Sequence, residues 1–164
     1  MKLRKKTKVV VALILTILAL CCLLFYVLDI PDIYVNMSNK KLLRKYGWEE
    51  IIDGGKETDG GKATLTDFTF EGIFKAKVTA SEAIGLHPTE YIGKEIYLTT
   101  YSYTLGYSVL GSNLYARIWR GNNKIICAYI CNNNENLPIH FWSISTPYSE
   151  IQADIYADYE NENH

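Results

Sequence analysis

Few residues of this 164-residue chain have the chemistry of a catalytic or metal site, since it contains four cysteines and three histidines. Cys127 and Cys131 lie four residues apart in KIICAYIC, a run whose apolar residues predict a central strand. At about 3.3 Å per residue they would stand roughly 13 Å apart, too far for a disulfide or a shared metal ion. The spacing therefore predicts two small buried apolar side chains.

Nucleophilic catalysis by a cysteine needs a nearby base, and histidine is the usual one. His140 lies about one strand away from Cys131 in the sequence, so a Cys131–His140 dyad is geometrically allowed, although no local motif supports it. His87 is expected in a loop and His164 ends the chain. HExxH and Gly-x-Ser-x-Gly motifs are missing from the sequence. We therefore expect no catalytic residues, no metal site and no cofactor.

Tyrosine is frequent, with 13 residues, and about half of them lie close together in the chain. Tyr97, Tyr101 and Tyr103 share one face of a predicted strand, and Trp119 lies in the next strand. Aromatic surfaces with hydroxyl groups are common in binding sites, so these four residues form the candidate binding site. The alternative is the outer face of an ordinary antiparallel sheet, where tyrosine is also favoured.

The first structural element that the sequence predicts is an apolar helix near the N-terminus. Val9 to Leu28 carries no charge, and a helix of this length rises roughly 30 Å, the thickness of the hydrocarbon core of a bilayer. A cleavable signal peptide would have a shorter apolar run and a small-residue cleavage site. Cys21 and Cys22 have no small residue before them, as a lipid-attachment signal would require, and so are interpreted as part of the span.

The charge pattern predicts the orientation of this span. Residues 1–8 carry five cations and no acid, and Asp29 follows the apolar stretch. Cations mark the cytoplasmic side, so we expect a single-pass protein of the cytoplasmic membrane, with its N-terminus inside and its C-terminal domain outside. The lipid bilayer, through residues 9–28, is then the first expected partner.

The rest of the chain is mildly acidic, which excludes one class of partner. Residues 30–164 contain 12 lysines and arginines against 17 acids, a net charge of −5. Nucleic-acid binding needs a basic surface, so no nucleic acid is expected, and anionic wall polymers would be repelled. An envelope protein or a glycan is the expected partner.

The domain organisation follows from turn and periodicity signals. Residues 1–8 form a cytoplasmic segment, 9–28 the anchor, 29–37 a linker, 38–146 an α+β domain, and 147–164 a short helix with an acidic tail. A first helix is expected from Ser38 to a stop at Gly47, with Trp48 folded back against the sheet. A Gly-rich segment, residues 49–63, reads as a mobile loop. A second helix begins at Asp67 or Thr69 and ends at Gly85.

About four strands are expected after, and partly before, that second helix. Four are a confident one at EIYLTTYSY, a pair at LYARIWR and KIICAYIC, and a last one at PIHFWSIS, with a loop at LGYSVLGSN. GKATLTDF could form a further short strand. A three-residue loop at 121–123 is expected, because it would pair Ile118 with Ile126 and keep one face apolar. A two-residue loop would instead set Arg117 opposite apolar residues.

Three segments in order resemble a family of small, anchored or secreted domains of unknown function in Gram-positive bacteria. They are KLLRKYGWE, YIGKEIYLTTYSYT and YARIWRGNNKIICAYICN, within residues 40–145. The matching positions are Gly47, Trp48, Tyr91, Gly93, Lys94, Tyr101, Tyr103 and Cys131. The Gly-rich segment and the tail after Ser145 depart from the family pattern. The resemblance implies an extracytoplasmic α+β domain and assigns no activity.

The sequence thus predicts an α+β protein with a transmembrane helix followed by helices packed on an antiparallel sheet. The function expected is a non-catalytic interaction or sensing module at the cell envelope. The alternative is a small envelope enzyme that uses a cysteine or a carboxylate.

Overall fold

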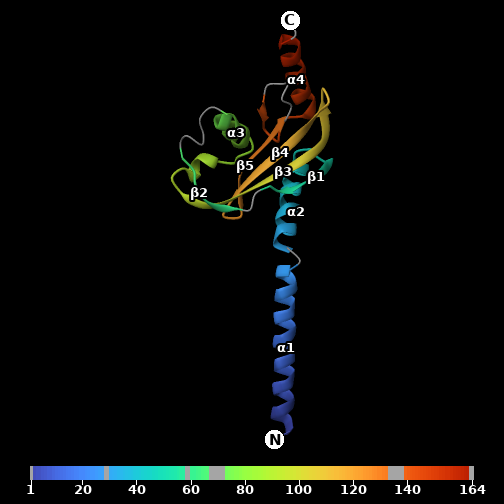
Figure 1. Ribbon diagram of the computed structural model, residues 1–164, viewed down its shortest axis with the longest axis vertical. Coiled ribbons are helices and arrows are strands. Elements are labelled where there is room, and N and C mark those ends of the chain that lie inside the picture. The colour runs from blue at the N-terminus through green and yellow to red at the C-terminus, as the bar shows by residue number, and fades with distance from the viewer. Residues whose placement is uncertain (1, 28–29, 58–59, 67–72, 133–138, 163–164) are drawn as a thin grey trace. The chain divides into compact units, whose positions relative to one another are not determined.

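The computed structural model describes all residues except 1, 28–29, 58–59, 67–72, 133–138 and 163–164 (Figure 1). Side chains are also left undescribed at 2–9, 24–27, 30–31, 73 and 162. The chain divides into two compact units, Met1–Ser38 and Asn39–His164. The start predicted for the second helix, at Asp67 or Thr69, lies outside the described residues.

The first unit is helical. Helix α1 spans Lys2–Val27, and helix α2 spans Ile30–Lys45 and continues into the second unit. Where the structure gives placements, no helix is both long and apolar enough to cross a membrane. The described side chains of α1 belong to residues 10–23. The span predicted at 9–28 stays a prediction.

The segment interpreted as a linker, residues 29–37, is helical from Ile30 onward, and α2 does not begin at Ser38. Pro31 falls in the first turn of α2, where its missing N–H costs no hydrogen bond and its fixed φ favours the helix. The predicted stop is confirmed. The N–H groups of Gly47 (φ +92°) and Trp48 donate to the carbonyls of Arg44 and Leu43, as in a Schellman motif.

The second unit is α+β, as predicted, but its antiparallel sheet has six strands where about four were expected. The strands are β1 (Ile51–Lys56), β2 (Gly61–Thr64), β3 (Glu95–Val109), β4 (Ser112–Gly121), β5 (Lys124–Asn132) and β6 (Phe141–Trp142). Their order is β1-β3-β4-β5-β6, and β2 pairs with β3 as well. Helix α3 (Ile73–Glu82), a 3-10 helix (Pro88–Tyr91) and helix α4 (Tyr148–Glu162) complete the fold.

The Gly-rich segment predicted as a mobile loop forms β1 and β2, so that prediction was wrong. Both strands pair with β3, β1 with residues 101–105 and β2 with residues 95–98. Gly54 has φ +130°, and a Cβ placed there would lie 2.2 Å from the carbonyl oxygen of Ser102. Glycine is therefore what lets β1 approach β3 at this point.

The segment LGYSVLGSN was predicted as a loop, but β3 continues through it to Val109. The chain reverses at Leu110 and Gly111, which have φ values of +50° and +77°. Two consecutive residues with positive φ make the tight hairpin turn that suits the twist of antiparallel strands. The hairpin of β3 and β4 is therefore longer than the sequence predicted.

The register predicted for β4 and β5 was wrong, although the apolar face was assigned correctly. Ile118 pairs with Ala128, not Ile126, because a two-residue turn at Asn122–Asn123 is followed by a bulge. The bulge inserts one extra residue in β5, which restores the match of apolar with apolar residues that a plain two-residue turn would lose.

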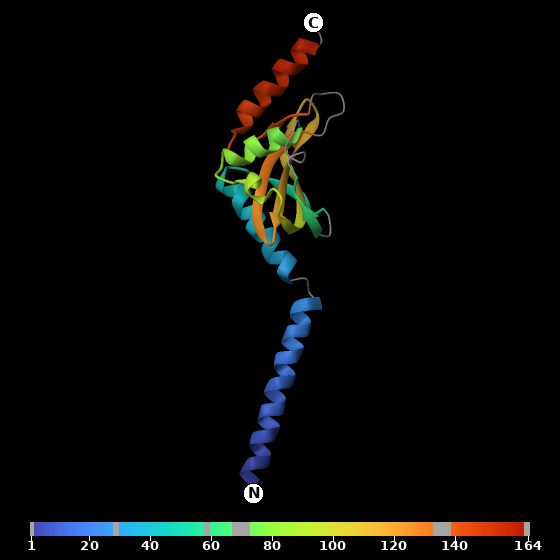
Figure 2. The ribbon, with the colours of Figure 1, turned by 90° about the vertical axis from the view of Figure 1, so that its left-hand side faces the viewer.

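Strand β5 is the centre of the core, because all of its residues from Ile126 to Asn132 are buried. Helix α3 packs on β5 and β6 (Figure 2), and the Ser81 hydroxyl contacts the backbone N–H and carbonyl of Ala128. On the opposite face, Asn39 of α2 donates to the Tyr103 hydroxyl at 3.0 Å. Trp48 is 2% exposed, which confirms its predicted burial, and its indole donates to the Ile144 carbonyl at 2.7 Å.

Replacing Gly54 with alanine is expected to lower the free energy of unfolding by about 2 kcal/mol or more. Alanine would be strained at this positive φ, and its Cβ would overlap the carbonyl oxygen of Ser102. Urea unfolding of the full chain in detergent micelles measures the change. Gly61→Ala in β2 is the matched control, because nothing lies within 4 Å of its Cβ position. Equal effects of the two substitutions would contradict the close approach of β1 to β3.

Candidate functional site

The four residues predicted as a binding site do not share a surface. Tyr101 and Tyr103, in the middle of β3, are 4% and 0% exposed, whereas Tyr97, near the start of the strand, is 55% exposed. Trp119 is adjacent in sequence to Ile118, which pairs with Tyr101, so Trp119 lies on the opposite face of the sheet. The binding role assigned to these residues stays a prediction, but the structure does not bring them together.

Tyr103 belongs to a buried polar network that joins α2 to the sheet. Asn39, which is fully buried, donates to the Tyr103 hydroxyl and accepts from Arg120 at 2.6 Å. Arg120 also donates to the carbonyl of Asn123 in the β4–β5 turn. Burial raises the pKa of Tyr103 to about 12, and the hydrogen bond with Asn39 opposes that rise. This network fixes packing and leaves no hydroxyl ready to titrate near neutral pH.

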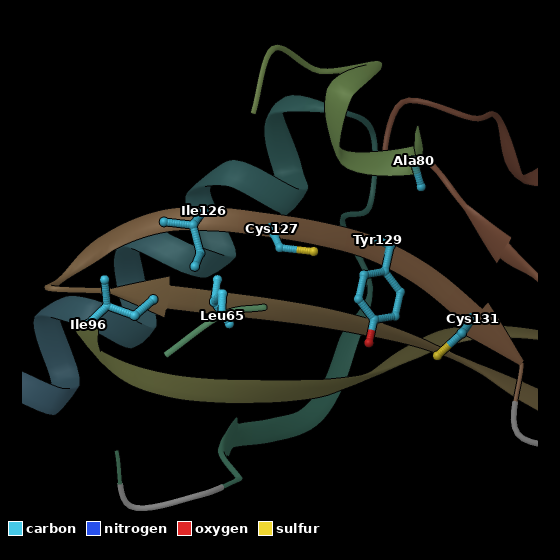
Figure 3. Close-up of a cluster of buried hydrophobic side chains, with 7 residues drawn as sticks. All are labelled: Leu65, Ala80, Ile96, Ile126, Cys127, Tyr129 and Cys131. Carbon is cyan, nitrogen blue, oxygen red and sulfur yellow. The ribbon is translucent and has the colours of Figure 1, made fainter. Parts of the chain in front are cut away.

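Cys127 and Cys131 lie on one side of β5 with Tyr129 between them (Figure 3). Both are free thiols and both are buried. Burial raises the pKa of Cys127 to about 11, even though the Ser81 hydroxyl lies 3.1 Å from its sulfur. Burial also raises the pKa of Cys131. Thiols with such pKa values stay protonated at neutral pH and are poor nucleophiles.

The Cys131–His140 dyad is not formed. Cys131 pairs with Phe141 in the sheet, whereas His140 stacks on Trp142, with the two ring centroids 5.2 Å apart. Phe141 and Trp142 are consecutive strand residues whose side chains point to opposite faces, so the thiol and the imidazole are separated by the sheet. Across the described part of the chain, no group of three or more histidines, cysteines and acids could hold a metal ion.

Lys77 of α3 lies over the same face as the cysteines, among four aromatic rings. Its ammonium is 4.7 Å from the ring centroid of Phe74, 5.0 Å from Phe141, 5.4 Å from Tyr129 and 5.8 Å from Trp119. Burial lowers the pKa of Lys77, whereas cation–π attraction favours the charged form. Since the rings already enclose its own ammonium, this cage contributes to the packing of α3 on the sheet.

Helix α4 is attached to the sheet edge by two polar pairs. The Trp142 indole donates to Asp154 at 2.8 Å, and the His140 imidazole lies 2.6 Å from the Asp158 carboxylate, an ion pair when histidine is protonated. Four helical residues rise about 6 Å and two strand residues about 6.6 Å, so the two pairs match in spacing. We call these two contacts the α4 attachment.

An aromatic cleft lies where α2 ends, β3 ends and α4 begins. It has a volume of about 250 Å³ and is lined by Tyr46–Trp48, Tyr107 and Ser145–Tyr148. Tyr107 contacts Trp48 edge-on at 5.2 Å and Tyr148 at 5.0 Å between ring centroids. The Tyr148 hydroxyl donates to the Ser108 carbonyl at 2.8 Å, which fixes the ring at the cleft wall. Tyr46, Tyr107 and Tyr148 are partly exposed, so their rings are open to a ligand.

A second, wider hollow adjoins the aromatic cleft. It measures about 560 Å³ and lies between the small residues of one face of α3 and residues 141–143 and 146. The α3 wall is made by Ala76, Thr79 and Ala80, with Lys75 at its border, and Ala83 lines the hollow just after the helix ends. Thr146 lines both hollows. We call the pair the surface groove. It is shallow and rich in aromatic and hydroxyl groups, which suits binding rather than chemistry.

Sequence reasoning missed the aromatic cleft because its walls come from three separated segments. The sequence marks Trp48 as buried and Pro147 as the start of a helix. Nothing in it shows that the loop predicted at Leu105–Asn113 is a strand that carries Tyr107 to them.

Ionisation of the Cys127 thiol should lower the free energy of unfolding in alkali. Folding raises the pKa of this thiol from 9.0 to about 11. The stabilisation that the buried, protonated thiol gives the folded state is therefore complete below pH 9 and is lost as pH rises toward 11. The loss amounts to roughly 2–3 kcal/mol at 1.36 kcal/mol per pKa unit. Urea unfolding between pH 8 and 11 should show a shallower decline for Cys127→Ala than for wild type. Cys22→Ala in α1 is the control and should retain the full decline. Identical pH slopes for wild type and Cys127→Ala would contradict the burial of this thiol.

Comparison with family models, with curated proteins and with solved structures finds no match for this chain. The family resemblance drawn from its three segments therefore stays a prediction. The function has to be argued from the surface groove and the charge pattern.

Proposed function

We propose that this chain is a membrane-anchored, non-catalytic binding module that faces the outside of the cell. Residues 9–28 would hold it in the cytoplasmic membrane. The second unit would bind a component of the cell envelope in the surface groove.

The support for the anchor is the sequence around α1. Twenty uncharged residues follow five cations, and the apolar side chains described in α1, such as Val10, Leu15 and Leu23, are about half exposed or more. A helix that is apolar on all sides needs either a protein core or a lipid environment. Cations on the N-terminal side favour an N-inside orientation.

The observation that carries the binding role is the aromatic cleft. Three tyrosine rings are held by neighbouring side chains or backbone and stay partly exposed, which is a preorganised arrangement. Against catalysis in the second unit, Cys127 and Cys131 are buried and burial raises the pKa of both thiols, and Cys131 and His140 lie on opposite faces of the sheet. The described residues of the groove offer braced aromatic rings and hydroxyl groups, which supports a role in recognition.

A reporter that is active only outside the cytoplasm, fused after His164, should be active in a bacterial host. The reason is the five cations of residues 1–8, which should keep the N-terminus inside. Replacing all five by glutamine should lower the reporter activity several-fold at equal expression. Activity of a cytoplasm-only reporter at the same position would refute the topology.

Binding to envelope material should depend on the cleft tyrosines. The full chain, in lipid nanodiscs, should co-sediment with insoluble cell envelope from the bacterial host. Tyr148→Ala and Tyr107→Leu should each weaken this at least tenfold, because each removes an aromatic wall of the cleft. Tyr156→Ala is the matched control, since Tyr156 is exposed, does not line the groove and lies eight helical residues from Tyr148, roughly 12 Å along α4.

Thermal unfolding of each variant separates lost binding from lost folding. A cleft variant that unfolds like wild type and still co-sediments like wild type would exclude the cleft as the binding site. So would wild-type protein that fails to co-sediment.

A further inference from the structure

We propose that the ligand of the surface groove is an uncharged β-linked oligosaccharide, with one sugar ring stacked in the aromatic cleft and the chain continuing past Thr146. This inference rests on the binding role proposed above and adds the chemical class of the ligand. It follows from the charge, the rings, the hydroxyl groups and the shape of the groove.

The charge of the groove argues for a neutral ligand. Among the described residues that line the two hollows, Lys75 is the charged one, and it stands on the exposed border of α3. The surrounding domain carries a net charge of −5 over residues 30–164, which would repel an acidic polymer. A cationic ligand would find no carboxylate among the lining residues that the structure describes.

The aromatic rings of the cleft favour a ligand that has a flat face of C–H bonds. Tyr107 is already braced by Trp48 and Tyr148, so the cleft presents aromatic surface that does not need to reorganise on binding. A β-linked pyranose with equatorial substituents turns its axial C–H bonds toward both of its faces. Such a face stacks on a tyrosine ring, while the hydroxyl groups at its rim remain free to make hydrogen bonds.

Hydroxyl side chains are placed where that rim would lie. Ser145 and Thr146 line the cleft, and Thr79, Ser143 and Thr146 line the wider hollow. Hydroxyl groups both donate and accept, which matches the mixed donors and acceptors of a sugar. A proline-rich peptide also docks on aromatic grooves, but it brings carbonyl acceptors and few donors, so it would use these hydroxyls less fully.

The size of the surface groove favours a ligand with more than one sugar ring. The aromatic cleft, at about 250 Å³, is small for a complete ligand site, whereas the wider hollow, at about 560 Å³, falls within the usual range of roughly 300–1,000 Å³. Since Thr146 lines both, a chain that fills the cleft can continue into the wider hollow. A linear oligosaccharide of several rings fits this arrangement.

The test is isothermal titration of the full chain in lipid nanodiscs, because glycoside detergents would themselves present sugars. The probes are tetra-N-acetylchitotetraose, which is β-linked, maltotetraose, which is α-linked and curved, and decaproline. We expect the chitotetraose to bind at least tenfold more tightly than either other probe. Tyr148→Ala should weaken it at least tenfold, while Tyr148→Phe, which keeps the ring, should weaken it less than threefold. Tyr156→Ala, on the exposed side of α4, should leave it unchanged.

Other outcomes separate this inference from the binding role. Binding of decaproline, with the same dependence on Tyr148 and no binding of chitotetraose, would overturn the sugar and keep the binding module. Cleft-dependent co-sedimentation with the envelope, but no affinity for chitotetraose, would do the same. Failure of both the titration and the co-sedimentation would overturn the two proposals together.

Discussion

Strand β5 is buried on both faces, and most of the domain is arranged to satisfy that requirement. A strand without a solvent face needs a cover on each side and a partner on each edge. Helix α3 supplies one cover and the end of α2 contributes to the other, while β4 and β6 complete the edges. The bulge opposite Trp119 and Arg120 serves the same need, because it keeps apolar residues of β4 and β5 on a common face.

The surface groove exists because the cover on the α3 side is incomplete. The residues Ala76, Thr79, Ala80 and Ala83 are too small to fill the space beside residues 141–146, so a hollow remains. On its other side, the α4 attachment fixes the path of the chain after β6 and so sets where Pro147 and Tyr148 stand. Packing and recognition are therefore coupled: the contacts that hold α4 also position one wall of the aromatic cleft.

Local signals in the sequence predict the parts of the fold that depend on neighbours in the chain. Gly47 and Gly85 end helices as expected because a left-handed residue there closes a Schellman motif, and KIICAYIC is a buried strand because it is apolar throughout. The Gly-rich strand β1 is missed because its strand geometry comes from pairing with β3 rather than from its own composition. The cleft is missed for a related reason, since Trp48, Tyr107 and Tyr148 meet only when the β3–β4 hairpin is complete.

The hydrogen bond from Trp48 to Ile144 spans 96 positions of the chain, and this gives the domain an order of assembly. At a synthesis rate of about 5–20 residues per second, the indole emerges roughly 5–20 s before the carbonyl that receives it. The end of α2 lacks Tyr103 for the first part of that interval and Ile144 for all of it, and isolated short helices are marginal in water. The contact that buries Trp48 must therefore close late, and a chain released before Ile144 would leave Trp48 without this partner and open to chaperones and proteases.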